Sequence, residues 1–259
     1  DHTPGQFPNR GNPNSLAEQK YEFRVTLKPG IADKPSPAQR MFFGIALNGV
    51  PFEPGTAEVW NNDRSSGWHY QAMSGFMYLG LDRNHAHVQP NGAYHYHGLP
   101  VGMIERLGAT KDKMTLVGWA ADGFPIYAAY GYKDPGNAKS GVKELKPSYR
   151  LKTGTRPDGP GGSYDGRFEE DFEYVEGLGD LDEFNARQGV TPEFPDGTYH
   201  YVISNTYPFI GRSWRGTPDP SFFKAPPEGG RRRGPGGSGI RPPGPPPGGR
   251  PPDGRPPGR

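Results

Sequence analysis

Turn-forming residues interrupt this sequence every few positions and limit the length of any helix or strand. Of the 259 residues, 40 are glycine and 32 are proline. Glycine weakens a helix through its backbone entropy, and proline removes a hydrogen-bond donor. The runs between these breaks are short and rich in aromatic and β-branched residues, as in strands. We therefore predict an all-β fold, a single sandwich or barrel-like domain with short helices and long loops.

Strand patterns are clearest in four segments, which are residues 21–29, 41–52, 114–132 and 199–211. The first alternates apolar and polar residues, which is typical of a half-buried strand. The second and third contain Asn48-Gly49 and Asp122-Gly123, two dipeptides that favour tight turns between strands. Helices are predicted only over the short segments 99–109 and 179–189.

Composition divides the chain into a domain and a tail. Residues 225–259 contain 12 prolines, 11 glycines and seven arginines without a strict repeat, so we predict a disordered tail. The tail carries a net charge of +5 and the whole chain +2, which leaves 2 − 5 = −3 for residues 1–224. We predict that residues 1–224 form one domain, with residues 1–20 as an irregular arm. The tail is a candidate to contact an anionic polymer or surface. The net charge of −3 on residues 1–224 gives no indication of specific nucleic-acid binding by the domain.

Two absences narrow the chemistry and one feature suggests a location. The sequence has no cysteine, which excludes disulfides, thiolate metal sites and thiol nucleophiles. No apolar run is long enough for a transmembrane helix. The sequence begins with Asp1 and not with methionine, so we expect a mature protein whose signal peptide has been removed. The corresponding location is periplasmic, cell-surface or secreted.

Four of the seven histidines lie in one segment, NHAHVQPNGAYHYHG, residues 84–98. They form two His-x-His pairs, His85 with His87 and His95 with His97. Because side chains alternate across a strand, both members of a pair lie on the same face. Neutral imidazoles bind zinc, copper, nickel and iron, and two from one strand can reach a common ion. The segment therefore predicts a metal site.

The turn between the two pairs decides whether they combine. A two-residue turn over 91–92 puts His87 opposite Tyr96 and sends the pairs to opposite faces. A three-residue loop over 91–93 puts His87 opposite His97, and all four imidazoles then share a face. The sequence leaves both alternatives open.

A second copy of this pattern lies about a hundred residues further along the chain. The segments QPNGAYHYHG (89–98) and FPDGTYHYVI (194–203) both contain a turn followed by Tyr-His-Tyr. The alignment matches His200 with His95. We therefore predict His95, His97 and His200 as the principal metal ligands, followed by His85 and His87.

Further candidates surround the histidines. Asp82 is a candidate to orient a ligating histidine or to act as a base, and Tyr94 and Tyr96 are candidates to tune a metal. His69 is a weaker candidate ligand. The acidic segment 168–184 contains several carboxylates that suit calcium, but it lacks a known calcium-loop spacing.

Several long segments resemble the YHYH-domain family, named for Tyr94-His95-Tyr96-His97. They include LGLDRNHAHVQPNGAYHYHGLP, LVGWAADGFPIY, GGSYDGRFEEDFEYVEGLGDLDEFNARQGVTPEFPDGTYHYV and FIGRSWRGTPD. The resemblance covers residues 5–224. It implies an exported bacterial protein and does not imply a particular reaction.

These observations lead to one principal functional prediction and three alternatives. The principal one is an exported protein with a histidine-built copper site, since Cu(II) binds imidazole most tightly among the common divalent ions. Such a site suits an oxidative metalloenzyme that acts on an extracellular substrate. The alternatives are a zinc-dependent hydrolase, a copper carrier without turnover, and a non-catalytic surface-binding or matrix-binding module with structural histidines.

Overall fold

A computed structural model describes residues 3–39 and 41–224 of this chain. The tail predicted over 225–259 lies outside the described residues. Strands dominate the described part, and the few helices are short, so the predicted all-β fold is confirmed. Residues 3–20 hold no regular strand or helix, apart from an isolated bridge between Asn9 and Asn12.

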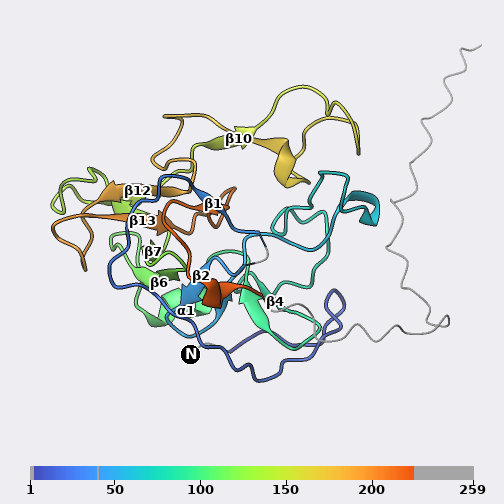
Figure 1. The fold of residues 1–259 in the computed structure, drawn as a ribbon, viewed down its shortest axis with the longest axis horizontal. Helices are drawn as coiled ribbons and strands as arrows, with labels where there is room; N and C mark the ends of the chain where they lie inside the picture. Colours follow the sequence, from blue (N-terminus) through green and yellow to red (C-terminus); the bar gives the residue numbers. More distant parts are fainter. Residues whose placement is uncertain (1–2, 40, 225–259) are drawn as a thin grey trace, which may run out of the picture. The chain divides into compact units, whose positions relative to one another are not determined.

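The largest element is a mixed sheet of eight strands, which runs from β12 at the left of Figure 1 to β4 at the right. Its strands, in spatial order, are β12 (Ala186–Gly189), β13 (Thr198–Val202), β7 (Pro125–Tyr127), β6 (Leu116–Ala120), β2 (Gly44–Ala46), β3 (Pro51–Phe52), β5 (Tyr94–Tyr96) and β4 (Ala86–Val88). Neighbouring pairs are antiparallel except β3–β5 and β7–β13, which are parallel. The two edge strands each have one neighbour, so the sheet is open.

Smaller elements surround this sheet. Three two-stranded sheets pair β1 (Ser36–Pro37) with β14 (Ser213–Trp214), β8 (Tyr130–Tyr132) with β9 (Val142–Glu144), and β10 (Tyr149–Leu151) with β11 (Phe172–Tyr174). The α-helix α1 spans Val101–Arg106, and three 3₁₀ turns span Trp60–Asn62, Glu169–Asp171 and Pro220–Phe222.

Glycine turns build the two central hairpins as the sequence predicts. Gly49 connects β2 to β3 with a φ of +83°, and Gly123 connects β6 to β7 with a φ of +91°. Only glycine adopts such values without strain. The helix predicted over 99–109 is also confirmed, as α1.

Two predicted elements are wrong. Residues 21–29 form no strand, since this segment makes no ladder with another strand and Leu27 is 96% exposed. Its alternation instead presents aromatic rings to the core, where Phe23 stacks on Phe222 at 4.6 Å. Residues 179–189 form no helix, because Asn185 has a φ of +58° and the chain then continues into β12. A left-handed residue ends a helix, and the pairing with β13 outweighs the local helix propensity.

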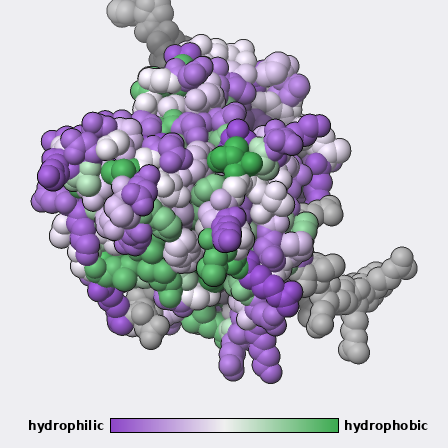
Figure 2. Space-filling model, turned by 60° about the vertical axis from the view of Figure 1, so that its left-hand side comes forward, coloured by the Kyte–Doolittle hydropathy of each residue, from purple (hydrophilic) through white to green (hydrophobic). Residues whose placement is uncertain are grey.

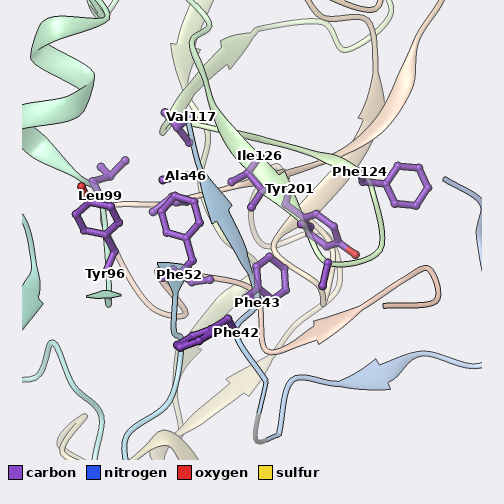
Figure 3. Close-up of a cluster of buried hydrophobic side chains, with 14 of the residues drawn as sticks. Phe42, Phe43, Ala46, Phe52, Tyr96, Leu99, Val117, Phe124, Ile126 and Tyr201 are labelled. Carbon is purple, nitrogen blue, oxygen red and sulfur yellow. The ribbon is translucent and has the colours of Figure 1, made fainter. Parts of the chain in front are cut away.

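Aromatic side chains from several strands form the core (Figure 3). The rings of Phe43 and Trp214 stack at 5.5 Å, and Tyr201 meets Phe43 edge-on at 4.9 Å. On the other side, Phe52 packs against Tyr96 from the neighbouring strand. Offset and edge-to-face contacts of this kind add to the free energy of apolar burial. The tyrosines of the two Tyr-His-Tyr segments therefore point into the core.

The surface drawn in Figure 2 is a mixture of hydrophilic residues and small hydrophobic areas. Within residues 3–39 and 41–224, no helix combines the length and the apolar character that a membrane span requires.

Candidate metal centre

The hairpin of β4 and β5 positions the histidines. His87 lies directly opposite His95, and the N–H of Gln89 donates to the carbonyl oxygen of Ala93 at 2.9 Å. The loop between these two residues therefore has three residues, 90–92. A three-residue loop puts His87, His95 and His97 on one face, as the three-residue alternative predicts. The loop covers residues 90–92 and not 91–93, so His87 lies opposite His95 and not opposite His97.

Three imidazoles meet at one point on this face. The Nε2 atom of His97 lies 3.0 Å from Nε2 of His95 and 3.1 Å from Nε2 of His87. The three ring centroids are separated by 4.7, 4.8 and 4.9 Å, and the ring planes are inclined to one another by 64°, 73° and 76°. Within the part of the chain that the structure describes, these residues form the one group of three or more histidine or carboxylate side chains whose donor atoms converge.

The other ring nitrogens determine which atoms face this point. Nδ1 of His87 lies 2.9 Å from the carbonyl oxygen of Leu79, and Nδ1 of His95 lies 3.3 Å from that of Ala93. Because a carbonyl only accepts, Nδ1 carries the proton in both rings, and each Nε2 presents a lone pair. Nδ1 of His97 is buried and has no hydrogen-bond partner among the described residues. The lone pairs of His87 and His95 therefore face Nε2 of His97, which either donates its own proton to one of them or joins them in holding a metal ion.

Burial keeps two of the rings neutral. His95 and His97 are 1% and 2% exposed. Desolvation lowers the pKa of His95 to about 4, although the carboxylate of Glu53 acts in the opposite direction. The pKa of His97 is lowered well below its usual value, first by burial and then by the two neighbouring imidazoles. Both rings are therefore unprotonated at neutral pH, which is the form that binds a metal.

Glu53 adds a carboxylate to the edge of the cluster. Its Oε2 atom lies 3.7 Å from Nε2 of His95 and accepts a hydrogen bond from Gln89 at 2.8 Å. Its other oxygen pairs with Lys224. Sequence reasoning missed Glu53, which directly follows β3. No local sequence pattern marks Glu53, because the pairing of β3 with β5, about 40 residues further along the chain, brings it to the histidines.

His85 and His200 lie away from the triad. His85 has a φ of +55°, its Nδ1 lies 2.9 Å from the carbonyl oxygen of Leu99, and it lines a separate cavity of about 310 Å³. His200 lies on β13, which is five strand positions from β5. At about 4.8 Å per strand, the separation is roughly 24 Å, too far for a shared ion.

The remaining candidates do not contact the triad histidines through any described hydrogen bond. Asp82 accepts a 2.6 Å hydrogen bond from the Tyr94 hydroxyl and the backbone N–H of Asn84, so it fixes the turn before β4. Tyr94 and Tyr96 project from β5 away from the histidines, and burial raises the pKa of both hydroxyls.

Cations neutralise the acidic segment that suggested calcium. Asp171 is fully buried and pairs with Arg156 at 2.7 Å, and Glu169 pairs with Arg212 at 2.5 Å. Glu170 pairs with His69 at 2.7 Å, which explains the environment of that histidine without a metal. These carboxylates do not converge on one point among the described residues.

Fold and site together define an all-β protein with a buried, three-histidine candidate metal centre. The family model described as "YHYH protein" matches residues 22–216, and this chain belongs to that family. The match includes the histidine triad, Glu53 and both Tyr-His-Tyr segments. Neither the curated proteins nor the solved structures include a match to the chain.

Proposed function

We propose that this chain is a metal-binding protein whose ion is held by the Nε2 atoms of His87, His95 and His97. The observation that carries the proposal is the convergence of three Nε2 atoms, with neighbouring atoms 3.0 and 3.1 Å apart. Tetrahedral ligands about 2.05 Å from an ion are about 3.3 Å apart, so small movements of the rings admit one. The family resemblance implies export, and we propose that the protein acts outside the cytoplasm.

The arrangement of the rings favours a tetrahedral ion. The nearly equal centroid separations of 4.7, 4.8 and 4.9 Å are those of three ligands on one triangular face. Square-planar Cu(II) requires two ligands on opposite sides of the ion. We therefore rank zinc first and copper, which the affinity order alone favours, second.

Metal content tests this proposal directly. Protein purified without a polyhistidine tag is loaded with zinc or copper, dialysed and analysed by mass spectrometry, and we expect close to one ion per chain. His97→Ala is expected to lose the ion, whereas His200→Ala, a matched change at another buried histidine, is expected to keep it. Wild-type protein without metal after both loadings would refute the proposal. Strong visible absorption after cobalt substitution would identify a tetrahedral site.

Hydrolysis is the reaction that this site suits best. A bound zinc ion lowers the pKa of its water to near 7. Glu53, whose Oε2 atom lies 3.7 Å from Nε2 of His95, is the carboxylate that would accept a proton from such a water, and its contacts with Gln89 and Lys224 hold its orientation. His87 is only partly buried, in contrast to His95 and His97. With activated esters as probes, Glu53→Gln is expected to lower the rate about 100-fold without loss of metal.

The burial of His95 and His97 favours a second candidate, an ion that is carried or structural and that undergoes no turnover. The same experiment distinguishes the two. A zinc-loaded protein that hydrolyses none of the esters and releases zinc only slowly to a chelator supports the carrier or structural role. A substrate, such as an extracellular polymer, is proposed only if the protein is an enzyme.

A further inference from the structure

The eight-stranded sheet consists of two halves with the same arrangement of strands. From the centre outwards, the order is β2-β3-β5-β4 in one half and β6-β7-β13-β12 in the other. Each half has an antiparallel hairpin, then a parallel neighbour, then an antiparallel edge strand. The two halves meet at the antiparallel pair β2–β6, where Ile45 lies opposite Trp119. A twofold rotation about this pair therefore relates them.

Strand register follows the same symmetry. Each cross-strand pair of the first half has an equivalent pair in the second half. Gly44–Phe52 corresponds to Gly118–Ile126, and Phe52–Tyr96 corresponds to Ile126–Tyr201. At the edge strands, Ala86–Tyr96 corresponds to Ala186–Tyr201, and His87–His95 corresponds to Arg187–His200.

Side-chain contacts repeat as well. The Tyr94 hydroxyl donates to Asp82 at 2.6 Å, and the equivalent Tyr199 hydroxyl donates to Asp182 at 2.7 Å. The residue before the edge strand is left-handed in both halves, with a φ of +55° in one and +58° in the other. Non-glycine residues adopt this conformation rarely, so the agreement extends to an unusual local feature.

The symmetry assigns an equivalent to each triad residue. His200 corresponds to His95, Arg187 to His87 and Val202 to His97. His200 also repeats the environment of its equivalent, because its Nδ1 lies 3.1 Å from the carbonyl oxygen two residues earlier. Its Nε2 is buried and has no hydrogen-bond partner among the described residues.

Arg187 brings a positive charge to this position. It lies directly opposite His200, is 8% exposed and donates from Nη2 to a backbone carbonyl at 2.8 Å. Its Nε is buried without a partner in the described part of the chain. Burying a guanidinium without a direct ion pair is uncommon, because its desolvation is costly, and among the described residues Asp180 and Asp134 act on it only from beyond ion-pair distance. Arg187 therefore stands at the position equivalent to His87, on the strand next to His200.

We infer that the second half of the sheet retains the frame of a metal site, in which the Arg187 guanidinium supplies the buried positive charge in place of an ion. The site excludes metal in the natural sequence and takes a divalent transition ion such as zinc once histidines stand at positions 187 and 202. This inference rests on the proposed function, in which the natural chain binds metal in the first half alone.

A gain of metal tests this inference. Arg187→His/Val202→His is loaded with zinc and dialysed, and we expect one zinc ion more per chain than in the parent protein. The matched control is Gln188→His/Val202→His, which adds equally many histidines. Gln188 is exposed and alternates to the other face of β12, so no additional zinc is expected.

Packing at position 202 requires a second variant. Val202 packs with Leu145 and Leu181, and circular dichroism checks whether the double variant is folded. If it is not, Arg187→His alone decides, in a His95→Ala/His97→Ala background that removes the first site. Its two imidazoles are expected to bind zinc about tenfold more tightly than Gln188→His in that background.

Each outcome separates the two proposals. A folded double variant without additional zinc, or equal zinc affinity of the two single variants, overturns the inference. Zinc in the double variant but none in the parent protein supports the inference and refutes the metal site in the first half. Zinc in the parent protein alone does the reverse.

Discussion

Zinc is expected to stabilise the wild-type protein strongly, because the Nε2 atoms of His87, His95 and His97 already converge on one point in the folded state. At a free zinc concentration about 100 times the dissociation constant, binding to the folded state adds about 2.7 kcal/mol to the free energy of unfolding. For a domain of this size, this free energy corresponds to an increase of about 5 to 10 °C in Tm. The expectation applies to protein first treated with a chelator.

His97→Ala removes the ligand that lies within 3.1 Å of both other Nε2 atoms. Loss of a residue that merely orients a ligand costs up to about 100-fold in affinity, and loss of a ligand costs at least as much. At the same zinc concentration, the variant is then at most about half saturated, and the gain falls to about 0.4 kcal/mol. The expected increase in Tm is below about 2 °C.

Thermal unfolding followed by circular dichroism measures both increases. His200→Ala is the control, since it truncates a histidine of equal burial outside the triad and is expected to retain the full increase on zinc addition. An unchanged Tm of the wild-type protein with both zinc and copper would refute the reasoning. So would an increase in Tm that survives in His97→Ala.

Three further results are expected from the wider fold. Burial lowers the pKa of His200 to about 4 in the folded protein, whereas a histidine in the unfolded chain titrates near 6.5. Between these two pH values the unfolded state binds more protons than the folded state. About 3 kcal/mol of the free energy of unfolding, present above pH 6.5, is therefore lost as the pH falls to 4. Urea unfolding at pH 7 and 4.5 measures this loss, and His200→Gln should weaken it. Tyr94→Phe removes a hydrogen bond to a carboxylate and should cost about 1.5 to 3 kcal/mol in urea unfolding, with metal content unchanged. Gly44→Ala would bring a Cβ to 2.4 Å from the carbonyl oxygen of Trp119. The Tm of this variant should fall by an amount that corresponds to about 1 to 3 kcal/mol. Gly49→Ala is the comparison variant, because there the added Cβ meets no atom within 4 Å and only the backbone strain remains.

Much of the local architecture follows from the sequence because turn chemistry acts over a few residues. Asn48-Gly49 and Asp122-Gly123 predict the central hairpins, and the structure contains both. The helix prediction for residues 179–189 is wrong because the helix propensity of this segment is outweighed by the pairing of β12 with β13. No local sequence pattern reveals that pairing. The same limit hides Glu53, since a parallel neighbour distant in sequence brings it to the histidines.

The histidine pattern contained more information than a ligand count. Spacing within 84–98 predicts paired imidazoles, but the loop over 90–92 alone determines that His87 joins His95 and His97. The second Tyr-His-Tyr segment suggested a further ligand for the same ion. In the structure it is instead the symmetry equivalent of the first segment, five strand positions away from it across the centre of the sheet. A repeated motif can therefore indicate a repeated frame with two separate positions, and only the strand order distinguishes that case from one shared site.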